Sequence, residues 1–229
     1  MIEARSLQKR YGQLQAVDDV SFAVRAGEAF GLLGPNGAGK TTTIHMLCGV
    51  LVPDAGEVVI DGRSDPMRPE VRRQIGIAPQ GLAIYEELTA AENLEMATLT
   101  GTTKADVEER AYSRFPRLAE RRSQVAGTLS GGEQQMLSMA RALATEPHLL
   151  LLDELSMGLA PIIVQGLYEQ VAEIAREGLS IVVVEQFAHE VLGVADTAAI
   201  MLHGKVRRVG PPEQIAEELT DAYLSGSAG

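Results

Sequence analysis

A glycine-rich segment at residues 34–42, GPNGAGKTT, places a lysine and two threonines where they can surround an anionic group. It matches the pattern G-x-x-x-x-G-K-[ST], whose backbone amides cradle phosphates when it lies between an apolar strand and a helix, as we expect here. Lys40 is placed to reach the β- and γ-phosphates, the Thr41 hydroxyl to bind Mg²⁺, and Thr42 to add a phosphate contact. The predicted nucleotide-binding residues in this segment are Gly34, Pro35, Asn36, Gly37, Ala38, Gly39, Lys40, Thr41 and Thr42.

Two acidic residues end a second apolar segment, LLLLDE, at residues 149–154. We predict a buried strand that brings Asp153 beside the phosphate-binding segment as a Mg²⁺ partner. Glu154 is then the candidate general base for an attacking water, a role typically worth on the order of 10²- to 10⁴-fold in rate. Two acids can also simply cap a strand-to-helix loop, but the phosphate-binding segment favours the catalytic interpretation.

The segment LSGGEQQML, residues 129–137, starts a predicted helix with two successive glycines. Ser130 and Glu133 have the spacing of a capping box, in which a hydroxyl and a carboxylate satisfy free amides of the first helical turn. Capping leaves Gly131 and Gly132 unexplained, since each costs about 1 kcal/mol relative to alanine inside a helix. A function that needs bare backbone is therefore expected at this position.

The elements that must position these residues follow from hydrophobic periodicity and from the glycines between segments. From residue 130 onward, helices alternate with apolar strands, which predicts a largely parallel sheet with helices on both faces. We expect strands at 2–11, 16–24, 28–33, 57–62, 72–80, 148–153 and 180–185, and a hairpin at 201–210. We expect helices at 41–51, 130 onward and 162–177, a short helix between 185 and the hairpin, and two or three helices within 88–126.

Composition limits the classes of protein that this chain can belong to. Its 229 residues carry a net charge of −11, which argues against a general nucleic-acid surface. No apolar run approaches the roughly 20 residues that span a bilayer, and nothing resembles a signal peptide. The one cysteine, Cys48, is expected to pack in the core and fits a reducing compartment. We expect a cytoplasmic protein with no nucleic-acid partner.

Four segments, GPNGAGKTT, APQ, LSGGEQQ and LLLLDE, occur in an order and spacing that resemble the ATP-binding subunits of ABC transporters over essentially the whole chain. The resemblance implies an α/β fold, a P-loop NTPase of the ABC type. It has a mostly parallel sheet core, an N-terminal antiparallel β subdomain and an inserted α-helical subdomain that carries the signature helix. We expect one domain over 1–229, with an ATP-binding core of 1–87 and 150–229 and a helical subdomain of 88–149.

The resemblance also implies roles for residues outside the phosphate-binding segment. Ser130, Gly131 and Gly132 would bind the γ-phosphate of ATP held by the other subunit of a head-to-tail dimer. Gln80 in APQ would contact Mg²⁺ and the attacking water, or it is a polar residue in a surface turn. Tyr11 would stack on adenine, or it is an aromatic residue at a strand edge.

The segment GLAIYEELTAAENL, after Gln80, resembles the part of these subunits that contacts the membrane permease. Leu82, Ile84 and Tyr85 are candidate apolar anchors for that partner. The alternative is that these side chains pack within the chain itself.

Three positions depart from the usual family pattern. Gln186 stands where most members carry a histidine that contacts the γ-phosphate, and glutamine can donate a hydrogen bond but cannot carry charge. His189, one helical turn on, is expected at the surface. Ala160 replaces the usual aspartate of the loop after the catalytic glutamate, and Leu155 replaces the usual proline. Because Glu154 is retained, we expect activity, with Gln186 and Gln80 assisting.

These observations predict an ATPase subunit that binds ATP and Mg²⁺ and drives a membrane permease from the cytoplasmic face of the inner membrane, as a homodimer or with a paralogous ATPase. Gln186 and the segment GLAP resemble the ATPases of branched-chain amino acid importers, which favours import. The N-terminal half looks more like the ATPases of drug and polysaccharide exporters. A soluble ATPase unconnected with transport and an inactive regulatory subunit are the remaining alternatives.

Overall fold

The computed structural model describes residues 2–226, and for residues 63, 64, 99, 100 and 220–226 it describes the backbone alone. Four strands form an antiparallel sheet in the order β2-β1-β4-β5. In the second half of β2, side chains alternate between buried and exposed, as expected for a sheet with one face on the core. The strands are β1 (Ile2–Tyr11), β2 (Leu14–Val24), β4 (Ala55–Ile60) and β5 (Arg63–Ser64).

A second sheet has six strands in the order β10-β9-β3-β8-β7-β6, and only the β9–β10 pair is antiparallel. Every residue of its central strands β3, β7 and β8 is buried, which explains their continuous apolar sequences. The carboxyl ends of the parallel strands therefore meet at one edge. The strands are β3 (Ala29–Leu33), β6 (Ile75–Ala78), β7 (Leu149–Asp153), β8 (Ser180–Glu185), β9 (Thr197–Leu202) and β10 (Lys205–Gly210).

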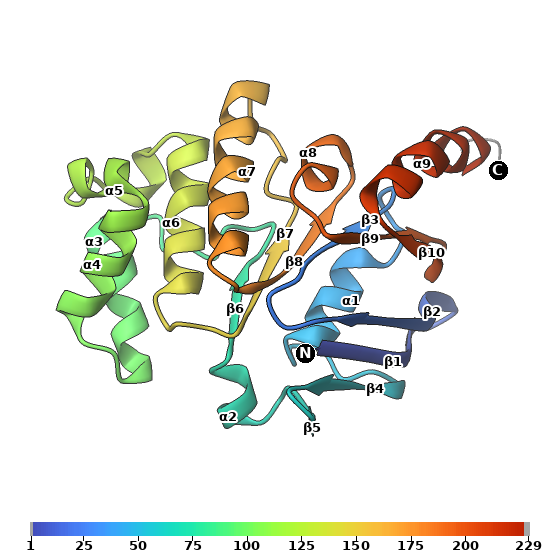
Figure 1. The fold of residues 1–229 in the computed structure, drawn as a ribbon. Coiled ribbons are helices and arrows are strands. Elements are labelled where there is room, and N and C mark those ends of the chain that lie inside the picture. Colours follow the sequence, from blue (N-terminus) through green and yellow to red (C-terminus); the bar gives the residue numbers. More distant parts are fainter. Residues whose placement is uncertain (1, 227–229) are drawn as a thin grey trace.

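Helices cover both faces of the parallel sheet (Figure 1). On one face, α1 (Lys40–Leu47) lies between the two sheets, and Ile44, Met46 and Leu47 are buried in a core shared by both. On the other face, α6 (Gly131–Leu143) and α7 (Pro161–Arg176) contribute to a second core. The remaining helices of this part are α2 (Pro69–Arg72), α8 (His189–Leu192) and α9 (Pro212–Gly226).

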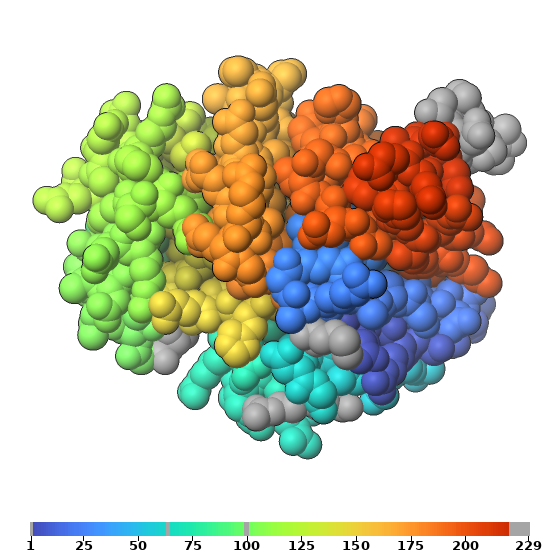
Figure 2. All heavy atoms as spheres, viewed as in Figure 1, coloured from blue at the N-terminus to red at the C-terminus, as the bar shows by residue number. Residues whose placement is uncertain are grey.

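A group of short helices forms a lobe beside α6, drawn in green in Figure 2. Its buried residues Leu94, Val107 and Leu118 pack in the same core cluster as Leu137 of α6, so the signature helix joins the lobe to the sheet. The elements are α3 (Ala90–Glu95), the 3₁₀ helix η1 (Met96–Thr100), α4 (Lys104–Arg114), α5 (Pro116–Glu120) and the 3₁₀ helix η2 (Ala126–Thr128).

The fold class is confirmed. The expected strands and helices are present, although the strand predicted over 72–80 is limited to β6 and the short strand β5 was not expected. The helix predicted over 41–51 ends at Leu47, because Gly49 adopts φ +69° and its backbone passes so close to Pro66 that a Cβ atom would lie 2.6 Å from the Pro66 carbonyl oxygen. Neither α2 nor α9 was expected. Within the described part of the chain, no helix is both long and apolar enough to cross a membrane.

Candidate active site

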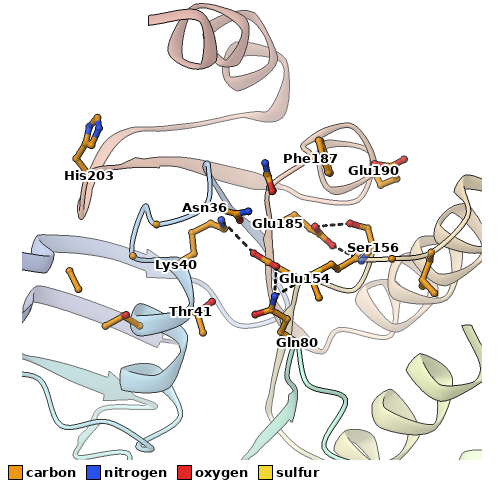
Figure 3. A pocket seen from close by; sticks show the side chains of 18 of the residues that line it. Asn36, Lys40, Thr41, Gln80, Glu154, Ser156, Glu185, Phe187, Glu190 and His203 are labelled. Carbon is orange, nitrogen blue, oxygen red and sulfur yellow. Dashed lines mark hydrogen bonds and ion pairs between the residues drawn. The ribbon is translucent and has the colours of Figure 1, made fainter. Parts of the chain in front are cut away.

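A cleft of about 920 Å³ opens at the carboxyl edge of the parallel sheet, where sequence-distant loops converge (Figure 3). Its walls come from the segment before α1, the turn after β6, and the loops after β7 and β8. The predicted site residues that line it are Tyr11, Asn36, Gly37, Gly39, Lys40, Thr41, Thr42, Gln80, Glu154 and Gln186.

Two glycines of the phosphate-binding segment pack so closely against neighbouring strands that no side chain would fit at their positions. A Cβ atom at Gly34 would lie 2.2 Å from the Met201 carbonyl oxygen, and one at Gly39 would lie 2.4 Å from that of Ala16. Gly39 also has φ +101° at the N-cap of α1, a backbone conformation that favours glycine. These contacts pack the segment against β2 and β9, independently of any phosphate.

Lys40 is almost fully buried at the start of α1, and its ammonium group bridges the loop that precedes it. Its Nζ donates hydrogen bonds to the carbonyl oxygens of Gly34, at 2.8 Å, and Pro35, at 3.1 Å. Burial lowers the pKa of Lys40, while Glu154, whose Oε1 lies 3.7 Å from Nζ, acts to raise it. Ala38, also in this segment, is buried in the core instead of facing the cleft.

Asp153, the last residue of β7, is 2% exposed, and its Oδ1 has no hydrogen-bond partner among the described residues. Burial raises the pKa of the Asp153 carboxyl to about 6, and the neighbouring charge of Glu154 acts in the same direction. The Thr41 hydroxyl and Lys40 act to lower this pKa. A buried carboxylate oxygen without a partner, near a threonine hydroxyl, is the kind of position that a hard cation can occupy.

Glu154 follows Asp153 with φ +53°, an uncommon conformation for a residue other than glycine. Its Oε2 accepts a hydrogen bond from Gln80 Nε2 at 2.9 Å, so the turn after β6 and the loop after β7 meet at this carboxylate. Figure 3 shows Lys40, Gln80 and Glu154 pointing toward one another. The Met157 Sδ lies 3.1 Å from the same Gln80 nitrogen, a contact that the sequence did not indicate.

The loop after β8 brings Gln186 to the cleft, directly after the buried Glu185. The Glu185 carboxylate accepts hydrogen bonds from the Ser156 amide and hydroxyl and from the Tyr168 hydroxyl. The sequence motifs did not indicate this cluster. Its only signal was an acidic residue at the end of an otherwise apolar strand.

The signature residues lie outside this cleft. The Ser130 and Glu133 side chains form the predicted capping box at the start of α6. Cβ atoms at Gly131 and Gly132 would lie 2.8 Å from Leu159 Cδ2 and 2.5 Å from Ile163 Cγ2, so both glycines also allow α6 to approach the start of α7. Within one chain, the structure does not bring this segment to Lys40 and Glu154.

The chain has the same arrangement of segments as a known family. A family model described as "ABC transporter" matches residues 17–156, which is more than half of the chain. The chain belongs to the ABC transporter ATPase family. It is the ATP-binding, ATP-hydrolysing subunit of a transporter.

Relatives of this ABC ATPase belong to different transport systems. The high-affinity branched-chain amino acid transport ATP-binding protein BraG of Pseudomonas aeruginosa is 40% identical, over 99% of this chain and 100% of BraG. The lipopolysaccharide export system ATP-binding protein LptB of Escherichia coli K12 is 36% identical, over 95% of this chain and 93% of LptB. The linearmycin resistance ATP-binding protein LnrL of Bacillus subtilis is 32% identical, over 96% of this chain and 72% of LnrL.

Solved structures agree with the fold. The ATP-binding subunit of an ABC transporter superposes with a TM-score of 0.85 at 30% identity, covering 99% of both chains. An ATP-binding cassette in its ADP conformation superposes with a TM-score of 0.83 at 27% identity, covering 96% of this chain and 95% of that one.

The positions at which this ABC ATPase departs from the family pattern have distinct surroundings. Leu155 is buried in the core, whereas Ala160 is exposed at the N-cap of α7 and provides no side-chain cap. Gln186 reaches the cleft, and His189 is exposed on α8, where it does not line the cleft. His189 is therefore at the surface, as expected.

The candidate permease anchors separate into two environments. Leu82 lines a small cavity of about 280 Å³ between the loop after β6 and α6, and Ile84 packs against the core. Tyr85 is 48% exposed, and the Arg141 guanidinium lies over its ring, 5.2 Å from the centroid. Tyr11, at the end of β1, is 50% exposed at the rim of the cleft.

Proposed function

We propose that this ABC ATPase binds Mg-ATP in the cleft of Figure 3, pairs head-to-tail with a second ATPase subunit, and drives a membrane permease for amino acid import of the branched-chain type. One observation carries the catalytic part of this proposal. Lys40, Gln80 and Glu154 converge in one cleft beside the buried Asp153, while the signature segment lies outside it.

The predicted site residues of the cleft have distinct roles in the proposed hydrolysis. Backbone amides of Asn36, Gly37 and Gly39 and the ammonium group of Lys40 bind the β- and γ-phosphates, and the Tyr11 ring stacks on adenine. Glu154 accepts a proton from the attacking water, which Gln80 helps to orient. Gln186 donates a hydrogen bond to the γ-phosphate, where it cannot also carry a proton as a histidine could.

The residues present fit a Mg²⁺ ion. Asp153 Oδ1 has no partner among the described residues, and the Thr41 hydroxyl interacts with the same carboxyl group. Together with the Gln80 amide oxygen, they would provide an all-oxygen set of ligands. Mg²⁺ is usually held by one or two carboxylates together with substrate phosphates, so a site with one carboxylate is sufficient. When bound, Mg²⁺ would neutralise charge that develops on the phosphates.

The second subunit supplies what one chain lacks in its own cleft. Ser130 is exposed at the start of α6, where the free amides and partial positive charge of a helix N-terminus can meet a γ-phosphate. Because Ser130 does not line its own cleft, its natural target is ATP held by another copy or by a paralogue.

Dimerisation can be tested with Glu154→Gln, which should retain ATP and hold the closed dimer. In analytical ultracentrifugation this variant should sediment as a dimer with Mg-ATP and as a monomer without it. Adding Ser130→Arg should abolish the dimer without weakening ATP binding by the monomer. A Glu154→Gln protein that binds ATP but stays monomeric would contradict the head-to-tail proposal for a homodimer, and mixing with a paralogue would then decide the heterodimer.

The permease is proposed to dock on the surface around Leu82, Ile84 and Tyr85, which places the subunit peripherally on the cytoplasmic face of the inner membrane. The cavity beside Leu82 can accept an apolar side chain, and Arg141 adds a cation at its edge. Tyr85→Glu should release the ATPase from its permease in purified membranes. Met67→Glu is the matched control, because Met67 has the same 48% exposure on a different surface.

Transport direction has two candidates. The 40% identity to BraG, Gln186 and the segment GLAP favour import, whereas the 36% identity to LptB supports export. Affinity purification of tagged Glu154→Gln from native membranes with Mg-ATP should recover small multi-span permeases with a sister ATPase if the system imports amino acids. Recovery of a single exporter-type permease would replace import by export, and recovery of soluble partners alone would contradict both.

A further inference from the structure

The carboxyl end of β8 is tied to two loops of the cleft through its backbone. The Glu185 carbonyl oxygen accepts a hydrogen bond from the Gly34 amide at 3.3 Å, which fixes the start of the phosphate-binding segment. One residue earlier, the Val184 carbonyl oxygen accepts the Glu154 amide at 2.9 Å. The end of β8 therefore sets the relative placement of Lys40's loop and of the candidate base.

The Glu185 side chain adds a third tie, to the loop that follows Glu154. Its Oε1 lies 2.9 Å from the Ser156 amide nitrogen, its Oε2 lies 2.8 Å from Ser156 Oγ, and the Tyr168 hydroxyl donates to Oε1 at 2.9 Å. Glu185 is only 1% exposed, and Figure 3 shows its bonds to Ser156 beside Glu154. Three donors thus compensate a buried carboxylate that solvent does not reach.

Glu154 has an unfavourable backbone conformation that the surrounding hydrogen bonds must stabilise. Its φ of +53° lies in a region that residues other than glycine keep only when the surrounding structure holds them there. The hydrogen bonds of the Glu154 amide and of Ser156 bracket this residue, and both end on β8. They leave the Glu154 carboxylate directed at Gln80.

We propose that Glu185 is a positioning residue for ATP hydrolysis: through Ser156 it holds the loop that carries Glu154, and it keeps that loop in register with the phosphate-binding segment and Gln186. This inference rests on the proposed role of Glu154 as general base. Small displacements of catalytic groups can cost on the order of 100-fold in rate. Loss of the Glu185 side chain should therefore lower turnover and leave ATP affinity unchanged.

The test compares two serines that are tied to opposite ends of β8. Ser156→Ala removes the hydroxyl that donates to Glu185, and Ser180→Ala is the matched control, since Ser180 makes its hydrogen bonds with Gly27 and Arg25 at the far end of the strand. We expect Ser156→Ala and Glu185→Gln each to lower kcat about 10-fold, with KM for ATP within about twofold of wild type. Ser180→Ala should lower the melting temperature by about as much as Ser156→Ala does, and it should leave kcat unchanged.

Two further variants sharpen the result. Ser156→Thr keeps the hydroxyl and should restore most of kcat, and the Ser156→Ala/Glu185→Gln double variant should be no slower than the slower single variant. Equal kcat for Ser156→Ala and Ser180→Ala, or additive losses in the double variant, would overturn the inference. The proposed base is tested separately, because Glu154→Gln must lower kcat by roughly 10²-fold or more whatever the outcome for Glu185.

Discussion

The two ends of the parallel sheet are built from the same strands, but their charged groups differ in burial and in ion pairing. At the carboxyl end, Asp153 is buried with an oxygen that has no partner among the described residues, and Glu154 has a positive φ. At the amino end, a cavity of about 550 Å³ is bordered by side chains in ion pairs, Arg110–Glu146 at 3.0 Å and Arg114–Glu177 at 2.6 Å. Among these described charged groups, a buried carboxylate oxygen without a partner occurs only at the carboxyl end, where the chemistry is proposed. A positive φ does not separate the two ends, because Glu146 has φ +50°.

The largest expected difference between the two ends is in kcat, and Glu154→Gln at the carboxyl end should produce it. Removing the candidate base at the carboxyl end should lower kcat by roughly 10²- to 10⁴-fold, since a positioned base contributes that much. ATP binding should persist, because Lys40 and the amides before α1 are unchanged. Single-turnover hydrolysis and equilibrium ATP binding, measured on the same preparation, check both parts. Turnover within threefold of wild type would assign the base to another residue.

Asp153→Asn should lower Mg²⁺-dependent turnover by about 100-fold while making the ligand-free protein more stable. The pKa of about 6 means that the folded state binds this proton more tightly than the unfolded chain. Stability from this group is therefore greatest below about pH 4 and is lost as pH rises to about 6. At pH 7.5 the variant should gain roughly 1–3 kcal/mol in its free energy of unfolding.

Chemical denaturation at pH 4.5 and pH 7.5 tests this sign. Wild type should lose stability between the two values relative to Asp153→Asn. Asp61→Asn, at the amino end, is the control and should not reproduce the difference. A variant that is less stable than wild type at pH 7.5 would show that the Asp153 carboxylate is not the strained group that its burial implies.

The cleft was predictable from sequence to the extent that its residues lie in contiguous motifs. Lys40, Thr41 and Asp153 stand at fixed positions in segments whose strand and helix context is readable from apolar periodicity. Glu185 and Ser156 were not predictable, because 29 residues separate them and only the pairing of β7 with β8 brings them together. The same limit applies to Gly131 and Gly132, whose contact with α7 is a tertiary packing feature.

The fold shows a similar division. Strands such as β7 and β8 were evident because every residue is buried and all but the polar residues at their ends are apolar. The end of α1 at Leu47 was not, because the residues that follow, Val50 and Leu51, continue an apolar pattern although both of their amides turn back to the His45 carbonyl. The division into core and helical subdomains stays a prediction.

Ala160→Asp should stabilise the carboxyl end by a smaller amount. Ala160 is the N-cap of α7 with the extended backbone that a capping residue needs, but it has no side-chain oxygen, and the first turn of α7 has no acidic residue. A capping aspartate typically contributes about 1 kcal/mol to stability. Ala160→Asn separates hydrogen bonding from charge. If neither variant raises the free energy of unfolding, partner contacts and not capping decide this position.

The smallest effects are expected at the amino end. The side chains of Arg114 and Glu177 remain 27% and 57% exposed, so water screens their pair. A double-mutant cycle of Arg114→Met and Glu177→Gln should give a coupling energy of only about 0.2–1 kcal/mol, with kcat within about twofold of wild type. The pair nonetheless links α4 of the lobe to the end of α7. A tenfold fall in kcat in either single variant, without loss of ATP binding, would mean that the amino end affects the position of Ser130. The contrast between a catalytic carboxyl end and a structural amino end would then no longer hold.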